Sequence, residues 1–134
     1  MSWDIFAMDF PRDVKSVKDM PDDYEPGPIG KRSEIIASIL EVAPSADFSD
    51  PCLGKLDGDG WGMDISTGHD EICSCVTFHV YGGGDAAIMV SAILTKLNLR
   101  AVETGTGDFF IAGDEAAESF QRWQRYRDQN CQQQ

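Results

Sequence analysis

Four side chains of the kind that bind zinc lie close together in the sequence: His69, Cys73, Cys75 and His79. All four are odd-numbered, so they would share one face of a single strand. At ~3.3 Å per residue, however, positions 73 and 79 would lie about 20 Å apart. Zinc–ligand bonds are only ~2.0–2.3 Å long, so one ion cannot bind all four residues. A smaller site, made by the two cysteines and a neighbouring strand, is the alternative to two reduced thiols on a sheet face.

The same spacing argues against a nucleophile–base pair of Cys75 with His79. Residues four apart on one face of a strand are ~13 Å distant, which is beyond hydrogen-bond reach. The sequence contains no G-x-S-x-G elbow, no H-E-x-x-H motif and no P-loop. It therefore assigns no catalytic residue, metal or cofactor, and it favours a function that is not enzymatic.

Two glycine-containing motifs are explained as turns. The loop at 57–60, with the sequence D-G-D-G, has alternating aspartates like a calcium loop, but Trp61 and Gly68 stand where an EF-hand needs further oxygen ligands. A hairpin turn accounts for the same residues. The segment 81–85, Y-G-G-G-D, leads from a strand into a helix, where Asp85 would cap the helix and repel a phosphate.

Charge is the more informative feature of this chain. Its 134 residues carry 23 acidic and 11 basic side chains, a formal net charge of −12. Such a surface disfavours nucleic acid and anionic lipid as partners. Residues 47–71 contain seven acidic residues against Lys55 alone, so the turns there should attract cationic partners. The alternative is that these carboxylates only keep the protein in solution.

A basic protein partner would be attracted by part of this acidic segment. Trp61 would add the kind of aromatic anchor that dominates interfaces. The predicted partner-binding residues are Asp57, Asp59, Trp61, Asp64, Asp70 and Glu71. By contrast, Arg122, Arg125 and Arg127 make the last predicted helix basic. That helix would pair with the acidic surface within the chain or in a homo-oligomer.

The elements that must position these residues are those of one α+β domain over residues 1–128, followed by a polar, frayed tail at 129–134. We expect a first strand buried on both faces, a long Pro-rich surface segment at 11–32, and a helix capped by Ser33. Alternation and turn residues then predict a three-strand antiparallel meander, ending in a strand whose even-numbered side chains face the core. The expected strands and helices, in the order β-α-β-β-β-α-β-α, are 3–10, 33–43, 53–57, 61–66, 72–81, 85–97, 99–103 and a helix from Asp114.

This order predicts a two-layer fold in which helices cover a mainly antiparallel sheet. The helix at 85–97 should bury Ala86, Met89, Val90, Ile93 and Leu97, with Ile88 and Leu94 widening the stripe. No apolar run reaches the ~20 residues of a membrane span, and the N-terminus has no basic stretch followed by a hydrophobic one. With four cysteines, which fit reduced thiols, we expect a cytoplasmic protein.

Several motifs carry a resemblance to a protein family. They are S-W-D-I at the start, P-D-D-Y-E-P-G-P-I-G before the first helix, A-D-F-S-D-P after it, and G-T-G-D-F-F late in the chain. With them, the chain resembles a group of small bacterial proteins of uncharacterised function, from Ser2 to about Arg127. The resemblance implies no catalytic residue. In its size, acidity and fold class, though in no motif, the chain is also similar to immunity proteins that neutralise bacterial toxins.

The sequence thus supports a leading hypothesis and two alternatives. The leading one is a non-enzymatic domain that binds a basic protein, such as an immunity or inhibitor protein for a basic toxin domain. The second is a small-molecule-binding or enzymatic domain that uses the face formed by Cys73, Cys75, His79 and Tyr81. The third is a homodimer with a structural role.

Overall fold

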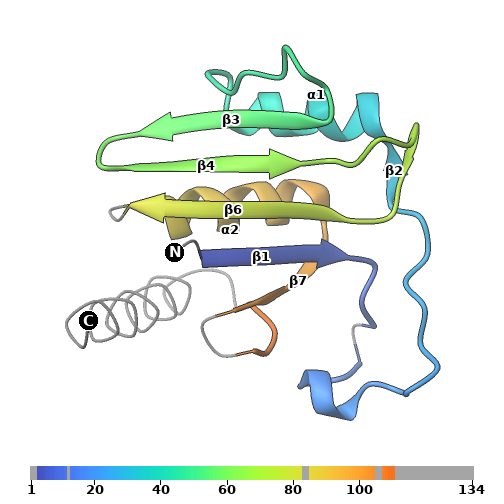
Figure 1. Cartoon of the computed structure of the whole chain (residues 1–134). Helices are drawn as coiled ribbons and strands as arrows, with labels where there is room; N and C mark the ends of the chain where they lie inside the picture. The colour runs from blue at the N-terminus through green and yellow to red at the C-terminus, as the bar shows by residue number, and fades with distance from the viewer. Residues whose placement is uncertain (1–2, 12, 83–84, 105–106, 111–134) are drawn as a thin grey trace, which may run out of the picture.

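The structure, a computed structural model, describes residues 3–11, 13–82, 85–104 and 107–110 (Figure 1). Its strands are β1 (Trp3–Met8), β2 (Gly30–Lys31), β3 (Leu53–Gly58), β4 (Trp61–Ser66), β5 (Ile72–Cys73), β6 (Val76–Gly82) and β7 (Arg100–Glu103). Its helices are the short 3-10 helix η1 (Val17–Asp19), α1 (Arg32–Val42) and α2 (Ala86–Leu97). Neither α-helix in this part of the chain is long and apolar enough to cross a bilayer.

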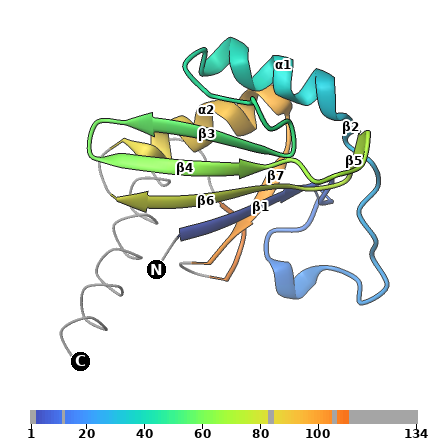
Figure 2. The same ribbon diagram turned by 45° about the horizontal axis from the view of Figure 1, so that its top comes forward.

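Five strands form the main sheet in the order β3-β4-β6-β1-β7, and every neighbouring pair is antiparallel. Strands β2 and β5 pair separately at one end. Both α-helices cover the same face of the main sheet, as Figure 2 shows. They are joined by an ion pair between Lys96 and Glu41, 2.5 Å apart. The predicted α+β fold with a mainly antiparallel sheet is confirmed, and β3, β4 and β6 form the expected meander.

The core lies between the helices and the inward face of the sheet. On β6 the buried side chains are Val76, Phe78 and Val80, and on β4 they are Met63 and Ile65. These strands follow the predicted alternation, in which every second side chain faces the helices. The inward faces of β1, β4 and β6 and the facing sides of both helices belong to one hydrophobic cluster.

The first strand differs from its prediction. Trp3, Ile5 and Ala7 are fully buried, but the residues between them are only half-buried, so β1 is buried on one face rather than two. The reason is its position between β6 and β7 in a sheet that carries both α-helices on a single face. The apolar side chain of Phe6 therefore lies on the face opposite the helices.

The predicted strand 72–81 is interrupted. Cys73 pairs with Gly30 of β2, whereas Val76 pairs with Ala7 of β1. The two residues between them shift the alternation, so Cys73 is buried and Ile72 is 50% exposed. The expectation that Ile72 faces the core, and that Cys73 shares a face with the odd-numbered residues of β6, is therefore wrong.

Both helices also correct details of the prediction. Helix α1 has Lys31 rather than Ser33 as its N-cap residue, without a side-chain capping bond. On α2, Ile88 is 59% exposed and Ala87 is buried in its place. Helix α2 ends at Asn98, a C-cap residue in the left-handed conformation with φ of 57°. The predicted helix from Asp114, its three arginines, Cys131 and the tail lie outside the described residues.

The Pro-rich segment 11–32 runs along the surface largely without regular structure, as predicted, and two side chains hold its first half. The guanidinium of Arg100 donates hydrogen bonds to the carbonyls of Pro11 and Val14, at 2.5 and 2.8 Å. The carboxylate of Asp108 accepts hydrogen bonds from the Ser16 hydroxyl and the Val17 amide, at 2.6 and 2.9 Å. These contacts fix the segment against the β7 side of the sheet.

The two edges of the main sheet are covered by short bridges. Asp47 exchanges backbone hydrogen bonds with Lys55 of β3, at 2.8 and 2.9 Å. At the other edge, Phe109 bridges Val102 of β7. Such coverage blunts both edges against the addition of a further strand.

Candidate functional site: the open face of the main sheet

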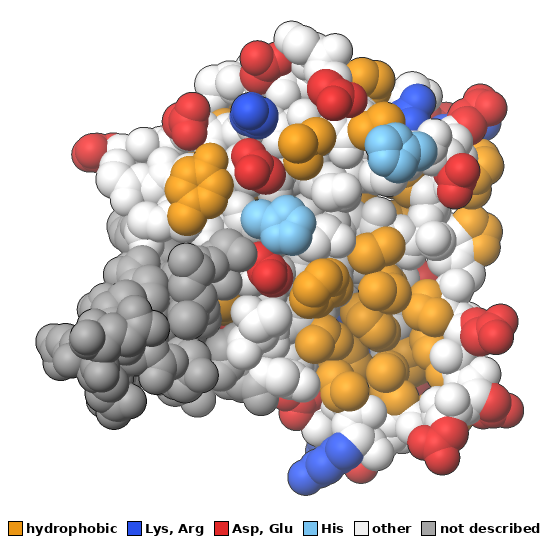
Figure 3. Space-filling model, viewed as in Figure 1, with side chains coloured by type: hydrophobic (Ala, Val, Ile, Leu, Met, Phe, Trp, Pro, Cys, Tyr) orange, Lys and Arg blue, Asp and Glu red, His pale blue; other side chains and the backbone are white. Residues whose placement is uncertain are grey.

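The face of the main sheet opposite the helices is called the open face here. Among its residues are Asp4, Phe6 and Met8 of β1, Lys55 and Asp57 of β3, Gly62, Asp64 and Ser66 of β4, Thr77, His79 and Tyr81 of β6, and Val102 of β7. Figure 3 shows this face, with polar and charged side chains over the upper strands and an apolar area over the right-hand ends of β1 and β7.

A row of charged residues crosses four strands of this face. Register places Lys55 opposite Asp64, Asp64 opposite His79, and His79 opposite Asp4. Nδ1 of His79 lies 2.9 Å from Oδ1 of Asp4, and both side chains remain partly exposed, at 41% and 29%. The imidazole is therefore oriented by one carboxylate and has a second, Asp64, on its other neighbouring strand.

Tyr81 lies one row further along the sheet and covers a glycine. Its partner across the strands is Gly62, whose own partner is Asp57. A Cβ atom on Gly62 would lie 2.6 Å from Cε2 of Tyr81 and 2.9 Å from Oδ1 of Asp57. The tyrosine ring and the carboxylate thus both occupy the space that a side chain at position 62 would need. Gly62 is buried although it is on the open face.

The phenol of Tyr81 is influenced by its burial and by the two carboxylates of this face. Loss of solvent contact raises the pKa of Tyr81, and the charges of Asp64 and Asp57 raise it further. The side-chain carboxylates of Asp57 and Asp64 make no hydrogen bond or ion pair with another described residue. The result is an exposed aromatic ring beside two carboxylates that make no ion pair with a described residue, although Lys55 is the cross-strand partner of Asp64.

The structure divides the predicted partner-binding residues between different parts of the surface. Asp57 and Asp64 lie on the open face, and Asp59 is exposed in the β3–β4 turn next to them. Asp70 and Glu71 are exposed near the opposite end of β4, close to β5. A six-residue strand spans about 20 Å, so the acidic residues form two groups rather than one.

Trp61 belongs to neither acidic group. It is half-buried and packs against the hydrophobic core. A Cβ atom on Gly58 would lie only 2.0 Å from Cε2 of Trp61, so the indole covers Gly58 on the helix side of the sheet. The exposed aromatic residue beside Asp57 is therefore Tyr81, which was expected only in the alternative site.

The zinc-type residues do not converge. His69 is exposed in a turn, while Cys73 is 2% exposed and its thiol donates a hydrogen bond to the Thr67 carbonyl, 3.1 Å away. Burial raises the pKa of the Cys73 thiol. No group of three metal-binding side chains occurs within the described residues. The alternative small-molecule site was predicted from Cys73, Cys75, His79 and Tyr81. Of these residues, His79 and Tyr81 lie on the open face. Cys75 lies next to this face, with its Sγ 3.6 Å from the Thr77 hydroxyl.

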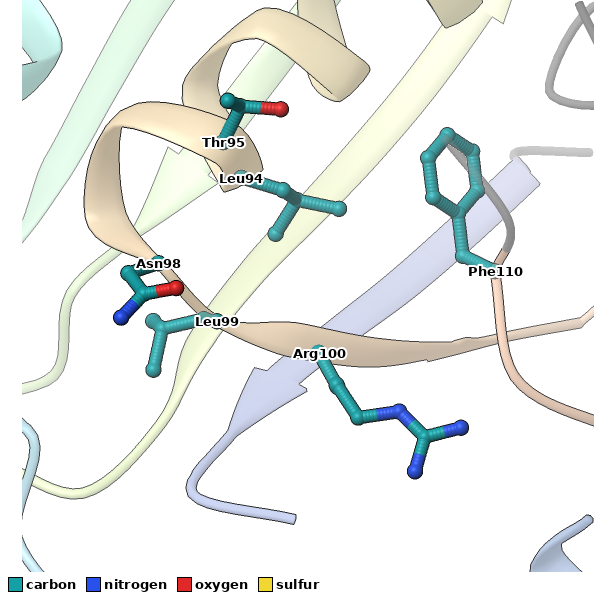
Figure 4. A pocket seen from close by; sticks show the side chains of 6 residues that line it. All are labelled: Leu94, Thr95, Asn98, Leu99, Arg100 and Phe110. Carbon is teal, nitrogen blue, oxygen red and sulfur yellow. The ribbon is translucent and has the colours of Figure 1, made fainter. Parts of the chain in front are cut away.

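A hollow of about 300 Å³ lies elsewhere, at the C-terminal end of α2. In Figure 4, Leu94 and Phe110 stand on opposite sides of it, and Arg100 points away from Asn98. The Arg100 guanidinium also lies 3.7 Å above the Phe109 ring, so this cation already binds the Pro-rich segment and an aromatic face. The hollow is lined by three apolar side chains, Leu94, Leu99 and Phe110, and by the polar side chains of Thr95, Asn98 and Arg100.

Comparison with known proteins gives no further guide to this face, because no protein-family model, curated protein or solved structure matches the chain.

Two features of the site were missing from the sequence prediction. Asp4 was not connected with His79, because nothing local indicates that β1 pairs with β6. Gly62 was seen only as a strand position, although in the sequence it lies between Trp61 and Asp64, two of the predicted partner-binding residues.

Proposed function

We propose that this domain binds a basic protein and that its working surface is the β3–β4 side of the open face. The observation that carries the proposal is that Asp57 and Asp64, which make no ion pair with a described residue, lie next to the exposed ring of Tyr81. Carboxylates that make no ion pair with another described residue attract a cationic partner and speed its encounter. The formal net charge of −12 acts in the same direction.

The proposed partner class is a basic toxin domain, which would make the protein an immunity or inhibitor protein. This finer proposal rests on the acidic surface and the small α+β fold. A gene for a basic toxin next to the gene for this protein would support it. Co-expression of the two proteins, with protection of the host only when the wild-type domain is present, is the corresponding functional test.

Affinity capture at two salt concentrations tests the general proposal. The full chain is immobilised and exposed to lysate at ~50 mM and ~500 mM salt, because screening weakens charge-steered binding. A double variant, Asp57→Asn with Asp64→Asn, is run beside a control with Asp70→Asn and Glu71→Asn. We expect a basic protein that is retained at low salt by the wild type and the control but lost from the first variant. Equal capture by all three proteins, or none, would count against the proposal.

A second candidate function is supported by the His79–Asp4 pair. An imidazole oriented by a carboxylate at 2.9 Å is the arrangement that tunes histidine for proton transfer or ligand binding. With Tyr81 and Cys75 nearby, this face would bind a small polar molecule. A thermal-shift screen tests that function, since a ligand at ~100 times its Kd adds roughly 2.7 kcal/mol of stability. Shifts that disappear in His79→Ala would support it over protein binding.

A further inference from the structure

We infer that Tyr81, Asp57 and Asp64, arranged around Gly62, form a site for an arginine side chain of the partner protein. This group of four residues is called the Tyr81 site below. The inference rests on the proposed function and deepens it by naming the group that is recognised. It follows from the geometry of three neighbouring strands, β3, β4 and β6.

The backbone builds the site by leaving out a side chain at its centre. Asp57, Gly62 and Tyr81 are consecutive partners across the three strands. Because Gly62 has no side chain, the phenol ring occupies the space above it, with Cε2 only 2.6 Å from the position of the missing Cβ. One side of the ring is thereby held against the sheet. Since 43% of Tyr81 remains exposed, its outer side faces solvent.

The carboxylates flank this ring and make no ion pair with a described residue. Asp57 is one strand from Gly62 in the same row, and Asp64 is two residues further along β4 on the same face. The nearest cation on the face, Lys55, is opposite Asp64 but makes no ion pair within the described part of the chain. The pKa of Asp47, at the sheet edge, is lowered by hydrogen bonds from the hydroxyl and amide of Ser49 and, to a smaller extent, by the charge of Lys55.

A guanidinium fits this arrangement better than an ammonium. It is planar, so it can stack on the exposed side of a tyrosine ring while its N–H groups point outward in the ring plane. There they can donate two parallel hydrogen bonds to one carboxylate and a further one to another. A lysine ammonium can form an ion pair with either carboxylate but cannot stack in this way. An anion would be repelled by both.

The shape of the surface indicates a macromolecular partner. The site lies on a sheet face rather than in an enclosed cavity, so a single side chain would bind it weakly. Thr77 lies on the same face of β6, four residues before Tyr81. Its cross-strand partner is Phe6 of β1, and the partner of Phe6 on β7 is Val102. These half-buried apolar side chains begin about 13 Å from Tyr81 and would contact the surface around the arginine. A protein segment with an arginine and an apolar side chain at that separation can cover both.

Titration with short peptides, followed by NMR on the ¹⁵N-labelled full chain, tests the inference directly. The probe is acetyl-Gly-Arg-Gly-amide, and the matched peptides carry lysine or citrulline, the uncharged isostere of arginine. We expect the arginine peptide to cause saturable shifts of the amides of Asp57, Gly62, Asp64 and Tyr81. The lysine peptide should bind with an affinity at least about threefold lower than that of the arginine peptide. The citrulline peptide should cause no such shifts.

Variants separate the ring from the charges. Tyr81→Ala and the double variant Asp57→Asn with Asp64→Asn should each weaken binding of the arginine peptide by about three- to tenfold. Tyr81→Phe should keep it, because the ring face is retained. Asp70→Asn removes one exposed carboxylate elsewhere and serves as the charge control. The dispersion of each variant's own spectrum shows whether it is folded.

The outcomes distinguish the inference from the proposed function. Identical binding of the arginine and lysine peptides, shifts spread over all acidic segments, or full binding by Tyr81→Ala would overturn the inference. If a basic protein is nevertheless captured through Asp57 and Asp64, the proposed function stands without it. If the peptide binds at the Tyr81 site but no basic protein is captured in a salt-sensitive way, the proposed function fails while the arginine site remains.

Discussion

The indole nitrogen of Trp3 donates a hydrogen bond to the carboxylate of Glu103, with 2.5 Å between Nε1 and Oε2. Both side chains are fully buried. Trp3 begins β1 and Glu103 ends β7, so the bond joins residues one hundred positions apart across two neighbouring strands. A carboxylate in a core is costly unless hydrogen bonds satisfy it. This contact therefore helps to specify that the short strand β7 pairs with β1.

Replacement of Trp3 by phenylalanine tests this bond. Trp3→Phe keeps an aromatic ring in the core but removes the N–H group, leaving Glu103 with one hydrogen bond fewer in a buried position. We expect a loss of about 1–3 kcal/mol in the free energy of unfolding, measured by urea titration with circular dichroism. Trp61→Phe, at a half-buried position whose indole makes no hydrogen bond with a described residue, should lose less. Equal losses would show that ring size, not the hydrogen bond, sets the effect.

Local patterns predicted those parts of the fold that local interactions determine. Alternation along 61–66 placed Met63 and Ile65 in the core, and the D-G-D-G sequence predicted the hairpin that joins β3 to β4. The position of β1 was not predictable, because its pairing with β6 and β7 depends on residues far along the chain. The interruption of the strand after Cys73 also depends on a distant partner. Residues 72–73 pair with β2, and this strand of only two residues has no recognisable sequence pattern.

In the candidate site, too, the residue types were predictable from the sequence, whereas their arrangement in space was not. Asp57 and Asp64 were predicted as binding residues and Tyr81 as part of an alternative site, each from its residue type. Their convergence around Gly62 required the register of three strands, which no short-range pattern contains. Trp61 was expected beside the aspartates, but strand alternation turns adjacent side chains to opposite faces. That rule alone could have separated Trp61 from Asp64.

Acid should weaken the anchoring of the Pro-rich segment through Asp108. Hydrogen bonds from the Ser16 hydroxyl, the Val17 amide and the Phe109 amide lower the pKa of this carboxylate. Because the folded pKa lies below the ordinary value, the stabilisation is fully present above about pH 4 and is lost as pH falls through the lower folded value. We expect Asp108→Asn to reduce stability at pH 7 by about 1 kcal/mol.

The pH profile distinguishes this role from a simple loss of charge. Between pH 7 and pH 3, the wild type should lose stability more steeply than Asp108→Asn, so that the difference between them narrows below about pH 4. Thermal unfolding at each pH provides the measurement. Asp22→Asn, which removes an exposed charge from the same segment, serves as the control for net charge. A constant difference between wild type and Asp108→Asn at every pH would contradict the prediction.

Gly82 should tolerate no side chain. Its φ of 91° is unfavourable for other residues, and a Cβ atom there would lie 2.5 Å from the backbone oxygen of Gly60. Gly68 is the matched control, because its φ is 81° but a Cβ atom would meet nothing within 4 Å. We expect Gly68→Ala to cost about 1 kcal/mol from backbone strain alone, and Gly82→Ala to cost about 2 kcal/mol or more. Equal costs, measured by urea unfolding, would mean that the β4–β6 contact relaxes easily.

The thiols should differ in reactivity according to their burial. Cys73 is buried, donates its S–H to the Thr67 carbonyl and has a raised pKa, so little thiolate forms and reagent reaches it slowly. Cys52 is half-buried, with its sulfur 3.6 Å from the guanidinium of Arg32. We expect iodoacetamide at neutral pH to alkylate Cys52 and Cys75 about tenfold faster than Cys73, followed by peptide mass spectrometry. In urea the three rates should become similar. Rapid labelling of Cys73 in the native protein would show that the β2–β5 end opens readily, and that its thiol is available to the alternative ligand site after all.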